Sequence, residues 1–169
     1  MKRNRGFTLI EILVVIAILG ILITAGFEAF TISLIKGRDS TRKGNLRAIS
    51  SALELYYNDN GRYPVGDANG SIVGCGGGTG SAPNPAPGVC PINGAFQDAN
   101  STLYMASLPT DPVSSLKYFY VSASGTQFQI YTHLENNQDS TIFSTSYNCN
   151  NGGANISCNW GLASPNVNP

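Results

Sequence analysis

The chain opens with a long apolar stretch. Between Ile12 and Phe27 the only polar side chain is that of Thr24. A helix rises about 1.5 Å per residue, so the roughly twenty residues that follow position 6 reach the ~30 Å of a bilayer core. We therefore predict a single membrane-spanning helix that begins at Phe7, in an apolar segment covering residues 7–35.

Residues 36–58 keep the helical period but carry many charges. The apolar side chains that share one face are those of Leu46, Ile49, Leu53, Tyr56 and Tyr57. Most polar side chains fall elsewhere around the helix, namely Arg42, Lys43, Arg47, Ser50 and Glu54. The run Asn58-Asp59-Asn60-Gly61 ends the pattern, because Asn and Gly tolerate the left-handed conformation found at helix ends. We predict one helix over 7–58, whose amphipathic half packs against a head formed by residues 59–169.

The head carries the alternating pattern of strands. In residues 127–134 we expect Phe128, Ile130, Thr132 and Leu134 to face inward, and Gln127, Gln129, Tyr131 and His133 to face outward. Residues 117–121 predict the preceding strand, 122–126 the connecting turn and 141–144 a third strand, while the polar, Asn-rich residues 148–169 predict irregular structure. The expected fold class is α+β, a long N-terminal helix packed against a small antiparallel sheet.

Four cysteines occur as two close pairs, Cys75 with Cys90 and Cys149 with Cys158. An even number in Gly- and Asn-rich loops favours disulfides. Three connectivities are possible, and nearest-neighbour pairing is preferred because short loops close easily. A four-thiolate zinc site is the alternative, but neither pair has the Cys-x-x-Cys spacing. Disulfides indicate an oxidising compartment outside the cytoplasm.

Charge is unevenly distributed, although the formal net charge is zero. Eight of the ten Lys and Arg residues lie between Lys2 and Arg47, and residues 59–169 carry six acids against two bases. An acidic head offers no basic stripe for phosphates, so we predict no nucleic-acid partner for it. His133 is the only histidine and no nucleophile motif accompanies it, so we predict no enzymatic activity.

One acid interrupts the apolar segment. Glu11 lies four residues after Phe7, inside the predicted hydrocarbon region, where an ionised side chain costs on the order of 3 kcal/mol. A buried carboxylate needs a partner. If the chain is cut between Gly6 and Phe7, the new α-ammonium group of Phe7 supplies that partner, in the same chain or in a neighbouring one.

The run Arg5-Gly6-Phe7-Thr8-Leu9-Ile10-Glu11, with the apolar residues after it, resembles the class III signal and N-terminal helix of type IV pilins and type II secretion pseudopilins. The resemblance implies a leader of residues 1–6, cleavage after Gly6 by a prepilin peptidase and N-methylation of Phe7 by the same enzyme. It also implies that Glu11 acts in filament assembly by pairing with the amino terminus of an adjacent subunit.

Two further segments carry the same resemblance. Residues 59–64, Asp-Asn-Gly-Arg-Tyr-Pro, and residues 108–112, Leu-Pro-Thr-Asp-Pro, look like the major pseudopilin and its pilin relatives. Major pseudopilins bind calcium in the loop after the hairpin, so the resemblance gives Glu135, Asn137 and Asp139 as a possible ligand set. The order of oxygen ligands departs from the family pattern, and we expect no metal or other cofactor. The family's proline near position 28 is absent here, so no proline-driven break of the helix is expected.

The expected function is that of a structural subunit of a type IV pilus-like filament, serving adhesion, motility or DNA uptake. The alternative within the family is the major pseudopilin of a type II secretion system. The resemblance implies a prepilin peptidase, an inner-membrane platform protein and a cytoplasmic assembly ATPase as partners, and a single-pass precursor in the inner membrane. The alternatives from other classes are a secreted binding module or hydrolase with an ordinary signal peptide, and an uncleaved signal anchor.

Overall fold

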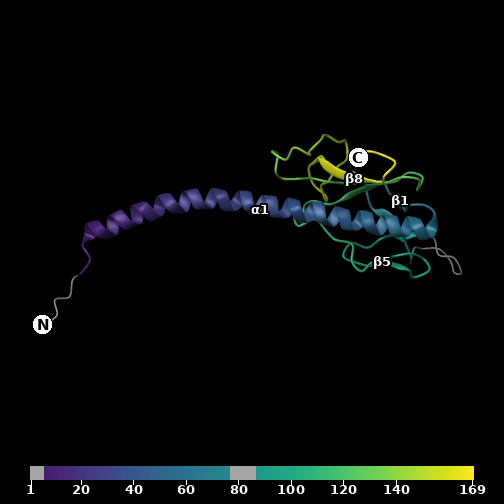
Figure 1. The fold of residues 1–169 in the computed structure, drawn as a ribbon, viewed down its shortest axis with the longest axis horizontal. Helices are drawn as coiled ribbons and strands as arrows, with labels where there is room; N and C mark the ends of the chain where they lie inside the picture. Colours follow the sequence, from purple (N-terminus) through teal and green to yellow (C-terminus); the bar gives the residue numbers. More distant parts are fainter. Residues whose placement is uncertain (1–5, 77–86) are drawn as a thin grey trace. The chain divides into compact units, whose positions relative to one another are not determined.

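The computed structural model describes residues 6–76 and 87–169. Its main element is the helix α1 (Leu9–Asn60), 52 residues long, which runs without interruption through residues 20–28 (Figure 1). The chain divides into two compact units, residues 1–37 and residues 38–169. The first unit contributes the apolar part of α1, and the second contains the rest of α1 with all the strands.

Both ends of α1 carry recognisable caps. The helix begins two residues later than predicted, because Thr8 takes the N-cap position with its hydroxyl 3.3 Å from the backbone nitrogen of Glu11. At the other end Gly61 has a φ of 70°, and its N–H donates to the carbonyl of Tyr57. A left-handed glycine in this place satisfies a carbonyl that the helix leaves open. The predicted stop signal is therefore used, two residues after the predicted end.

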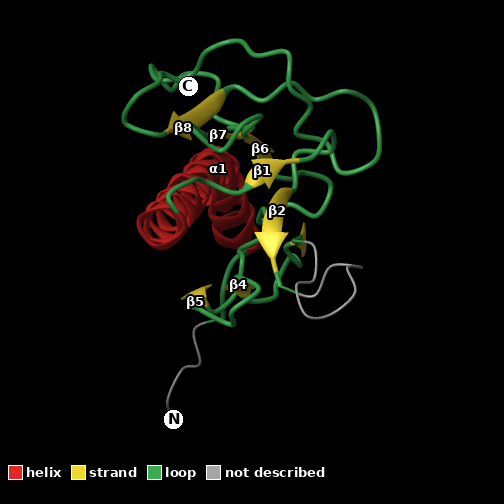
Figure 2. Cartoon of the chain, turned by 90° about the vertical axis from the view of Figure 1, so that its right-hand side faces the viewer, coloured by secondary structure: helices red, strands yellow, loops and turns green. Residues whose placement is uncertain are grey.

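Short antiparallel strands build the remainder of the second unit. One sheet has the order β1 (Val65–Gly66), β2 (Ile72–Cys75), β3 (Gly88–Val89), and a two-stranded ribbon pairs β4 (Phe96–Gln97) with β5 (Leu103–Met105). The third sheet has the order β6 (Phe119–Val121), β7 (Gln129–Thr132), β8 (Trp160–Ala163). The β4–β5 ribbon and the third sheet lie on opposite sides of the end of α1 (Figures 1 and 2). The predicted α+β class is confirmed.

The predicted hairpin is confirmed, but its third strand is not the predicted one. Strand β6 pairs with β7 in the register Tyr120 to Ile130. Residues 141–144 form no strand; instead β8, from the segment expected to be irregular, pairs with β7 in the register Ile130 to Leu162. The apolar run Trp160-Gly161-Leu162-Ala163 is the sequence signal that was overlooked.

The larger of two apolar clusters among the described residues lies between α1 and the sheets. As predicted, Leu46, Ile49, Leu53 and Tyr56 face this core, and Phe128, Ile130 and Leu134 meet them from the hairpin. Tyr57 is 40% exposed, so its predicted place on the buried face is wrong, although its ring stacks on Tyr63 at 4.6 Å. Tyr131, predicted to face outward, is buried because Cys149, Cys158, Phe143 and Tyr147 cover that face of the sheet.

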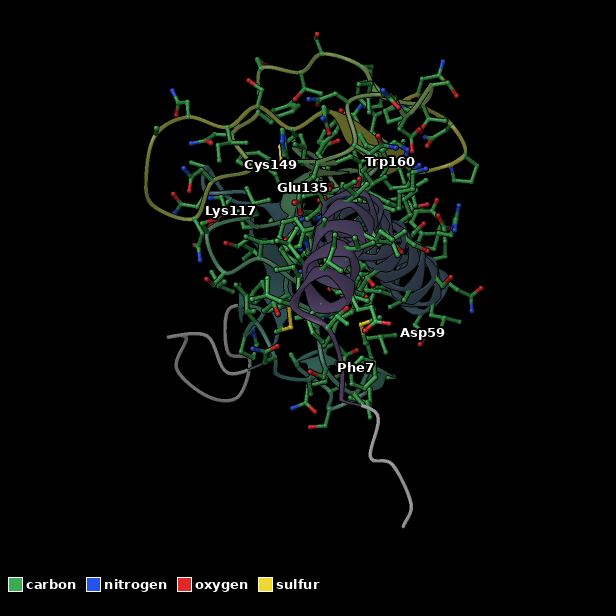
Figure 3. All side chains as sticks on the ribbon, turned by 90° about the vertical axis from the view of Figure 1, so that its left-hand side faces the viewer. Phe7, Asp59, Lys117, Glu135, Cys149 and Trp160 are labelled. Carbon is green, nitrogen blue, oxygen red and sulfur yellow. A yellow bond between two sulfur atoms is a disulfide. The ribbon has the colours of Figure 1, made fainter. Side chains whose placement is uncertain are left out.

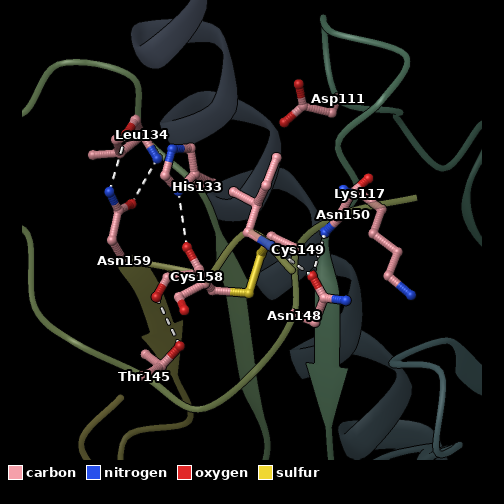
Figure 4. The surroundings of a disulfide bond; sticks show 12 residues. Asp111, Lys117, His133, Leu134, Thr145, Asn148, Cys149, Asn150, Cys158 and Asn159 are labelled. Carbon is pink, nitrogen blue, oxygen red and sulfur yellow. Dashed lines mark hydrogen bonds between the residues drawn. A yellow bond between two sulfur atoms is a disulfide. The ribbon is translucent and has the colours of Figure 1, made fainter. Parts of the chain in front are cut away.

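Two disulfides staple the loops of this unit. They join Cys75 to Cys90 and Cys149 to Cys158, which is the nearest-neighbour pairing preferred from the sequence. All four half-cystines are buried. The Cys149–Cys158 bridge packs against Tyr131 of β7, and hydrogen bonds surround it (Figure 4). Most of the Gly-rich segment between Cys75 and Cys90, residues 77–86, lies outside the described residues.

Candidate functional site

The peptide bond predicted to be cut lies in extended chain ahead of α1. Gly6, Phe7 and Thr8 precede the first helical residue, Leu9, and the Phe7 side chain is 85% exposed. A protease requires an accessible, non-helical substrate segment, because a helix withholds the backbone groups that the enzyme must bind. The bond between Gly6 and Phe7 therefore lies in backbone that a peptidase can reach.

Thr8 and Glu11 cap the helix reciprocally. The backbone nitrogen of Thr8 donates to Glu11 Oε2 at 2.8 Å, and the Thr8 hydroxyl donates to the same oxygen at 2.9 Å. In return, the Thr8 hydroxyl accepts from the backbone nitrogen of Glu11. This is the Thr-x-x-Glu capping box, in which two open donors at a helix start are satisfied by local side chains. The Thr8-Leu9-Ile10-Glu11 spacing contains this box, which was not among the features predicted from the sequence.

The surface of α1 that follows is apolar and uncovered. The helix is long and apolar enough to cross a membrane, and none of its most apolar 18-residue window is buried. The exposed fraction is 69% at Ile10, 71% at Ile21 and 67% at Phe27. A surface of this kind needs lipid or other apolar helices around it, because an uncovered apolar patch in water promotes association.

A second cluster of charged groups lies in the other unit, where α1 meets the loop after β7. Arg38 forms a bidentate pair with Glu135, at 2.9 Å from Nε to Oε1 and 2.5 Å from Nη2 to Oε2. Lys43 contacts Asp139 at 2.6 Å and lies 5.4 Å from the ring of Trp160. Both Glu135 and Trp160 are labelled in Figure 3. We call Arg38, Asp39, Arg42, Lys43, Asp111, Glu135 and Asp139 the helix–loop charge cluster.

Arg42 lies at the centre of this cluster and is fully buried. Its guanidinium donates two hydrogen bonds to Asp111 and one to Asp39, and it lies 2.7 Å from Glu135 Oε1. The prediction that Arg42 falls away from the buried face is therefore wrong. A buried cation is tolerated only when its charge and donors are met, and three carboxylates meet them here.

The pKa values of the cluster reflect these contacts. Burial alone would lower the pKa of Arg42, but its hydrogen bonds with Asp111, Glu135 and Asp39 outweigh burial and raise it. The hydrogen bond from Arg38, helped by Arg42, lowers the pKa of Glu135 to about 2. The hydrogen bond from Lys43 lowers the pKa of Asp139 to about 2. Both carboxylates are therefore ionised throughout the neutral and mildly acidic range.

The ion pairs of Glu135 and Asp139 determine whether the loop after β7 can bind a metal ion. Glu135 and Asp139, two of the three possible calcium ligands, already face Arg38, Arg42 and Lys43, while Asn137 is exposed. Within residues 6–76 and 87–169 no group of three or more His, Cys, Asp or Glu side chains is placed to hold a metal. Calcium needs several unpaired oxygen ligands, so the arrangement of this loop does not fit a calcium site.

His133 is held in a structural contact. Its Nδ1 lies 2.8 Å from the carbonyl oxygen of Ser157, next to the Cys149–Cys158 bridge (Figure 4). The next residue, Leu134, is held by the side-chain amide of Asn159. This amide accepts a hydrogen bond from the N–H of Leu134 and donates one to its carbonyl. The imidazole and this amide therefore tie the residues on either side of Cys158 to the residues that directly follow β7.

Comparison with known proteins finds a family motif in the N-terminal segment and relatives that are similar over part of the chain. The profile of the prokaryotic N-terminal methylation motif matches residues 1–27. The type IV major pilin protein PilA of Myxococcus xanthus is 39% identical over 61 residues, which cover 36% of this chain and 28% of the pilin. The type II secretion system core protein G of Klebsiella pneumoniae is 42% identical over 65 residues, 38% of this chain and 46% of that protein.

The same secretion protein of Pseudomonas aeruginosa is 40% identical over 63 residues, 37% of this chain and 44% of the relative. The chain therefore spans less than half the length of each of these curated relatives. No solved structure matches the chain significantly. The similarity includes the segment with the exposed Gly6–Phe7 bond and the Thr8–Glu11 cap.

Proposed function

Through its N-terminal segment the chain belongs to the type IV pilin and pseudopilin family, and from this premise we propose that it is a structural filament subunit. In this proposal the precursor is cut after Gly6, methylated on the new amine of Phe7 and polymerised through α1. The observation that carries it is the combination of an exposed Gly6–Phe7 bond, a carboxylate at Glu11 and an apolar helix surface with no cover of its own.

The physical logic of assembly follows from that surface. In the membrane, lipid covers the apolar side chains of α1, and in the filament the helices of neighbouring copies replace the lipid. The hydrophobic contribution then changes little between the two states, so packing and polar contacts between helices decide the register. Glu11 supplies the polar contact, because the cost of its charge in apolar surroundings is recovered when a positive amine comes within reach.

The proposal assigns the partners and the location. The precursor is a single-pass protein of the inner membrane with its head, residues 59–169, outside the cytoplasm, where the two disulfides are stable. A prepilin peptidase processes it, an inner-membrane platform and an assembly ATPase extrude it, and further copies of the chain are its principal partners. The filament is a head-to-tail assembly, extracellular for a pilus and periplasmic for a pseudopilus.

Mass spectrometry of the mature N-terminus tests the processing step. We expect the mature chain to begin with N-methylated Phe7. Replacement of Gly6 by a bulky residue is expected to leave the leader attached, and Gly20, a glycine within α1, provides the matched control position. A mature chain that begins beyond Ala25 would instead support a secreted module with an ordinary signal peptide.

The capping box makes it possible to separate two roles of Glu11. Glu11→Gln keeps a capping side chain but removes the charge, whereas Thr8→Ala removes the reciprocal cap but keeps the charge. If Glu11 pairs with an amine, Glu11→Gln blocks filament formation and Thr8→Ala allows it. Both variants must first be shown by mass spectrometry to be processed. Filaments from Glu11→Gln in wild-type amounts, together with none from Thr8→Ala, would assign Glu11 to helix capping alone.

Two uses of the filament remain, and each has an observation in its favour. Similarity to the secretion core protein G of several bacteria favours a secretion pseudopilus. Similarity to a major pilin, together with two disulfide-stapled loops on the head, favours a surface pilus for adhesion, motility or DNA uptake. Deletion of the gene distinguishes them, because loss of surface filaments with normal secretion supports the pilus and the reverse result supports the pseudopilus.

A further inference from the structure

A cavity of about 720 Å³ opens on the head, away from the helix–loop charge cluster apart from one shared residue, Asp111. Its floor is made of buried apolar side chains, each exposed by 7% or less: Ile49, Ile72, Leu108, Leu116, Tyr120 and Ile130. Ile92, which is 65% exposed, stands at the rim. An apolar floor of this size is typical of sites that take small molecules.

Both disulfide-stapled loops contribute walls to this cavity. Cys90 lines one side, and Asn151 and Gly152, from the loop between the other two cysteines, line another. The second loop is tied down beside the cavity, since the N–H of Asn151 donates to the carbonyl of Ser115 and the N–H of Lys117 donates to the carbonyl of Cys149. The wall that this second loop forms is therefore held in place, which lowers the cost of ordering it around a ligand.

Two charged residues, Asp111 and Lys117, line the cavity, and only the positive charge of Lys117 lacks an ion-pair partner among the described residues. Asp111 lines it, but both carboxylate oxygens of Asp111 are engaged by Arg42, and the side chain is fully buried. Lys117 also lines it, and its Nζ donates to the backbone carbonyl of Asn69 at 2.8 Å. No carboxylate of residues 6–76 and 87–169 forms an ion pair with Lys117. Figure 4 shows the Lys117 side chain extending away from the Cys149–Cys158 bridge.

We propose that this cavity binds a small amphipathic monoanion, with its apolar body on the floor and its carboxylate at Lys117. An ammonium group has three donors, so Lys117 retains donors for a ligand while it holds Asn69. A hydrogen bond from a charged ammonium to a carboxylate is stronger than one to a neutral hydroxyl, so Lys117 favours an anionic ligand. The site is independent of filament assembly, and its failure would leave the proposed function untouched.

Three probes that share one body test the charge preference. They are 4-phenylbutanoate, 4-phenylbutan-1-ol and 4-phenylbutylamine, which are anionic, neutral and cationic at neutral pH. Binding is measured by ligand-observed NMR titration of the full chain in nanodiscs of neutral lipid, with empty nanodiscs as the blank. We expect saturable binding in the order anion, alcohol, amine, with the anion bound about tenfold more tightly than the alcohol.

Matched variants then locate the site. Lys117→Gln is expected to weaken phenylbutanoate binding about tenfold while alcohol binding stays unchanged, and Lys117→Arg should restore most of the loss. Arg62→Gln is the control, since Arg62 is the only other cation beyond residue 47 and does not line the cavity. Ile92→Asp is expected to abolish anion binding at the rim, and Val89→Asp, at another exposed apolar residue outside the cavity, should leave it intact.

The binding data of these probes and variants either support the site or contradict it. Loss in Lys117→Gln and Ile92→Asp, with binding kept in Arg62→Gln and Val89→Asp, supports the site. Equal binding of the three probes, equal effects of Lys117→Gln and Arg62→Gln, or no saturable binding overturns it. Because Lys117, Ile92, Arg62 and Val89 are all at least partly exposed, these variants are expected to fold, and near-UV circular dichroism checks this.

Discussion

Arg42 and Asp111 form a bidentate ion pair in which neither side chain is exposed to solvent, with Nε to Oδ2 at 2.8 Å and Nη2 to Oδ1 at 2.9 Å. The two residues are 69 positions apart in the chain. Asp111 also caps its own loop by accepting the N–H of Val113. The pair therefore joins the middle of α1 to the segment before β6 at a point closed to water.

Removal of Arg42 is expected to destabilise the head strongly. Arg42→Ala leaves Asp111 as a buried unpaired charge, and breaking one partner of a buried pair typically costs about 3–5 kcal/mol. Arg47→Ala is the control, because Arg47 is exposed on the same helix, and we expect a change within about 0.5 kcal/mol. Denaturant unfolding of the detergent-solubilised chain measures both, and equal losses would refute a special role for the buried pair.

Stability should decline in acid because of Glu135 and Asp139. Their pKa values are lowered from 4.5 and 3.8 to about 2, so the unfolded chain takes up these protons at higher pH than the folded chain does. The stability that they contribute is thus fully present above about pH 5 and is lost as the pH falls toward 2. Thermal melting at a series of pH values checks this. In a Glu135→Gln/Asp139→Asn double variant the acid slope should be visibly shallower, and an unchanged slope would count against the assignment.

Two glycines of α1 and its cap should respond to alanine with opposite sign. At both Gly44 and Gly61 an added Cβ meets nothing within 4 Å, so only backbone conformation differs between them. Gly44 is helical, and Gly44→Ala should stabilise by up to about 1 kcal/mol. Gly61 has a φ of 70°, and Gly61→Ala should destabilise by about 1 kcal/mol. A shift of the melting temperature in the same direction for both would show that the C-cap geometry is wrong.

A pair of threonines tests what a hydroxyl contributes with and without a hydrogen-bond partner. The hydroxyl of Thr132 is fully buried and has no hydrogen-bond partner among the described residues, so Thr132→Val should stabilise by about 1 kcal/mol. The hydroxyl of Thr145 donates to the carbonyl of Cys158 at 2.7 Å (Figure 4), so Thr145→Val should destabilise by a similar amount. Melting temperatures of the two variants, compared with the wild type, distinguish the cases.

The sequence by itself determined the features that depend on neighbours along the chain. The apolar segment, the helix stop at Gly61 and the amphipathic face with Leu46 and Leu53 are local patterns, because helix geometry brings residues three and four apart onto one face. The motif around Gly6 and Glu11 is equally local. The Thr8–Glu11 cap was readable for the same reason, since both partners lie within one turn.

Only the tertiary structure decided which side chains of the head are buried. The helical pattern around Arg42 predicts a surface residue. In the structure Arg42 is buried, because Asp111 and Glu135, from loops far along the chain, pack against it. Tyr131 alternates outward on its strand, yet the segment stapled by Cys149 and Cys158 folds over it. Burial depends on what packs against a face from elsewhere, and periodicity within one element carries no information about that second surface.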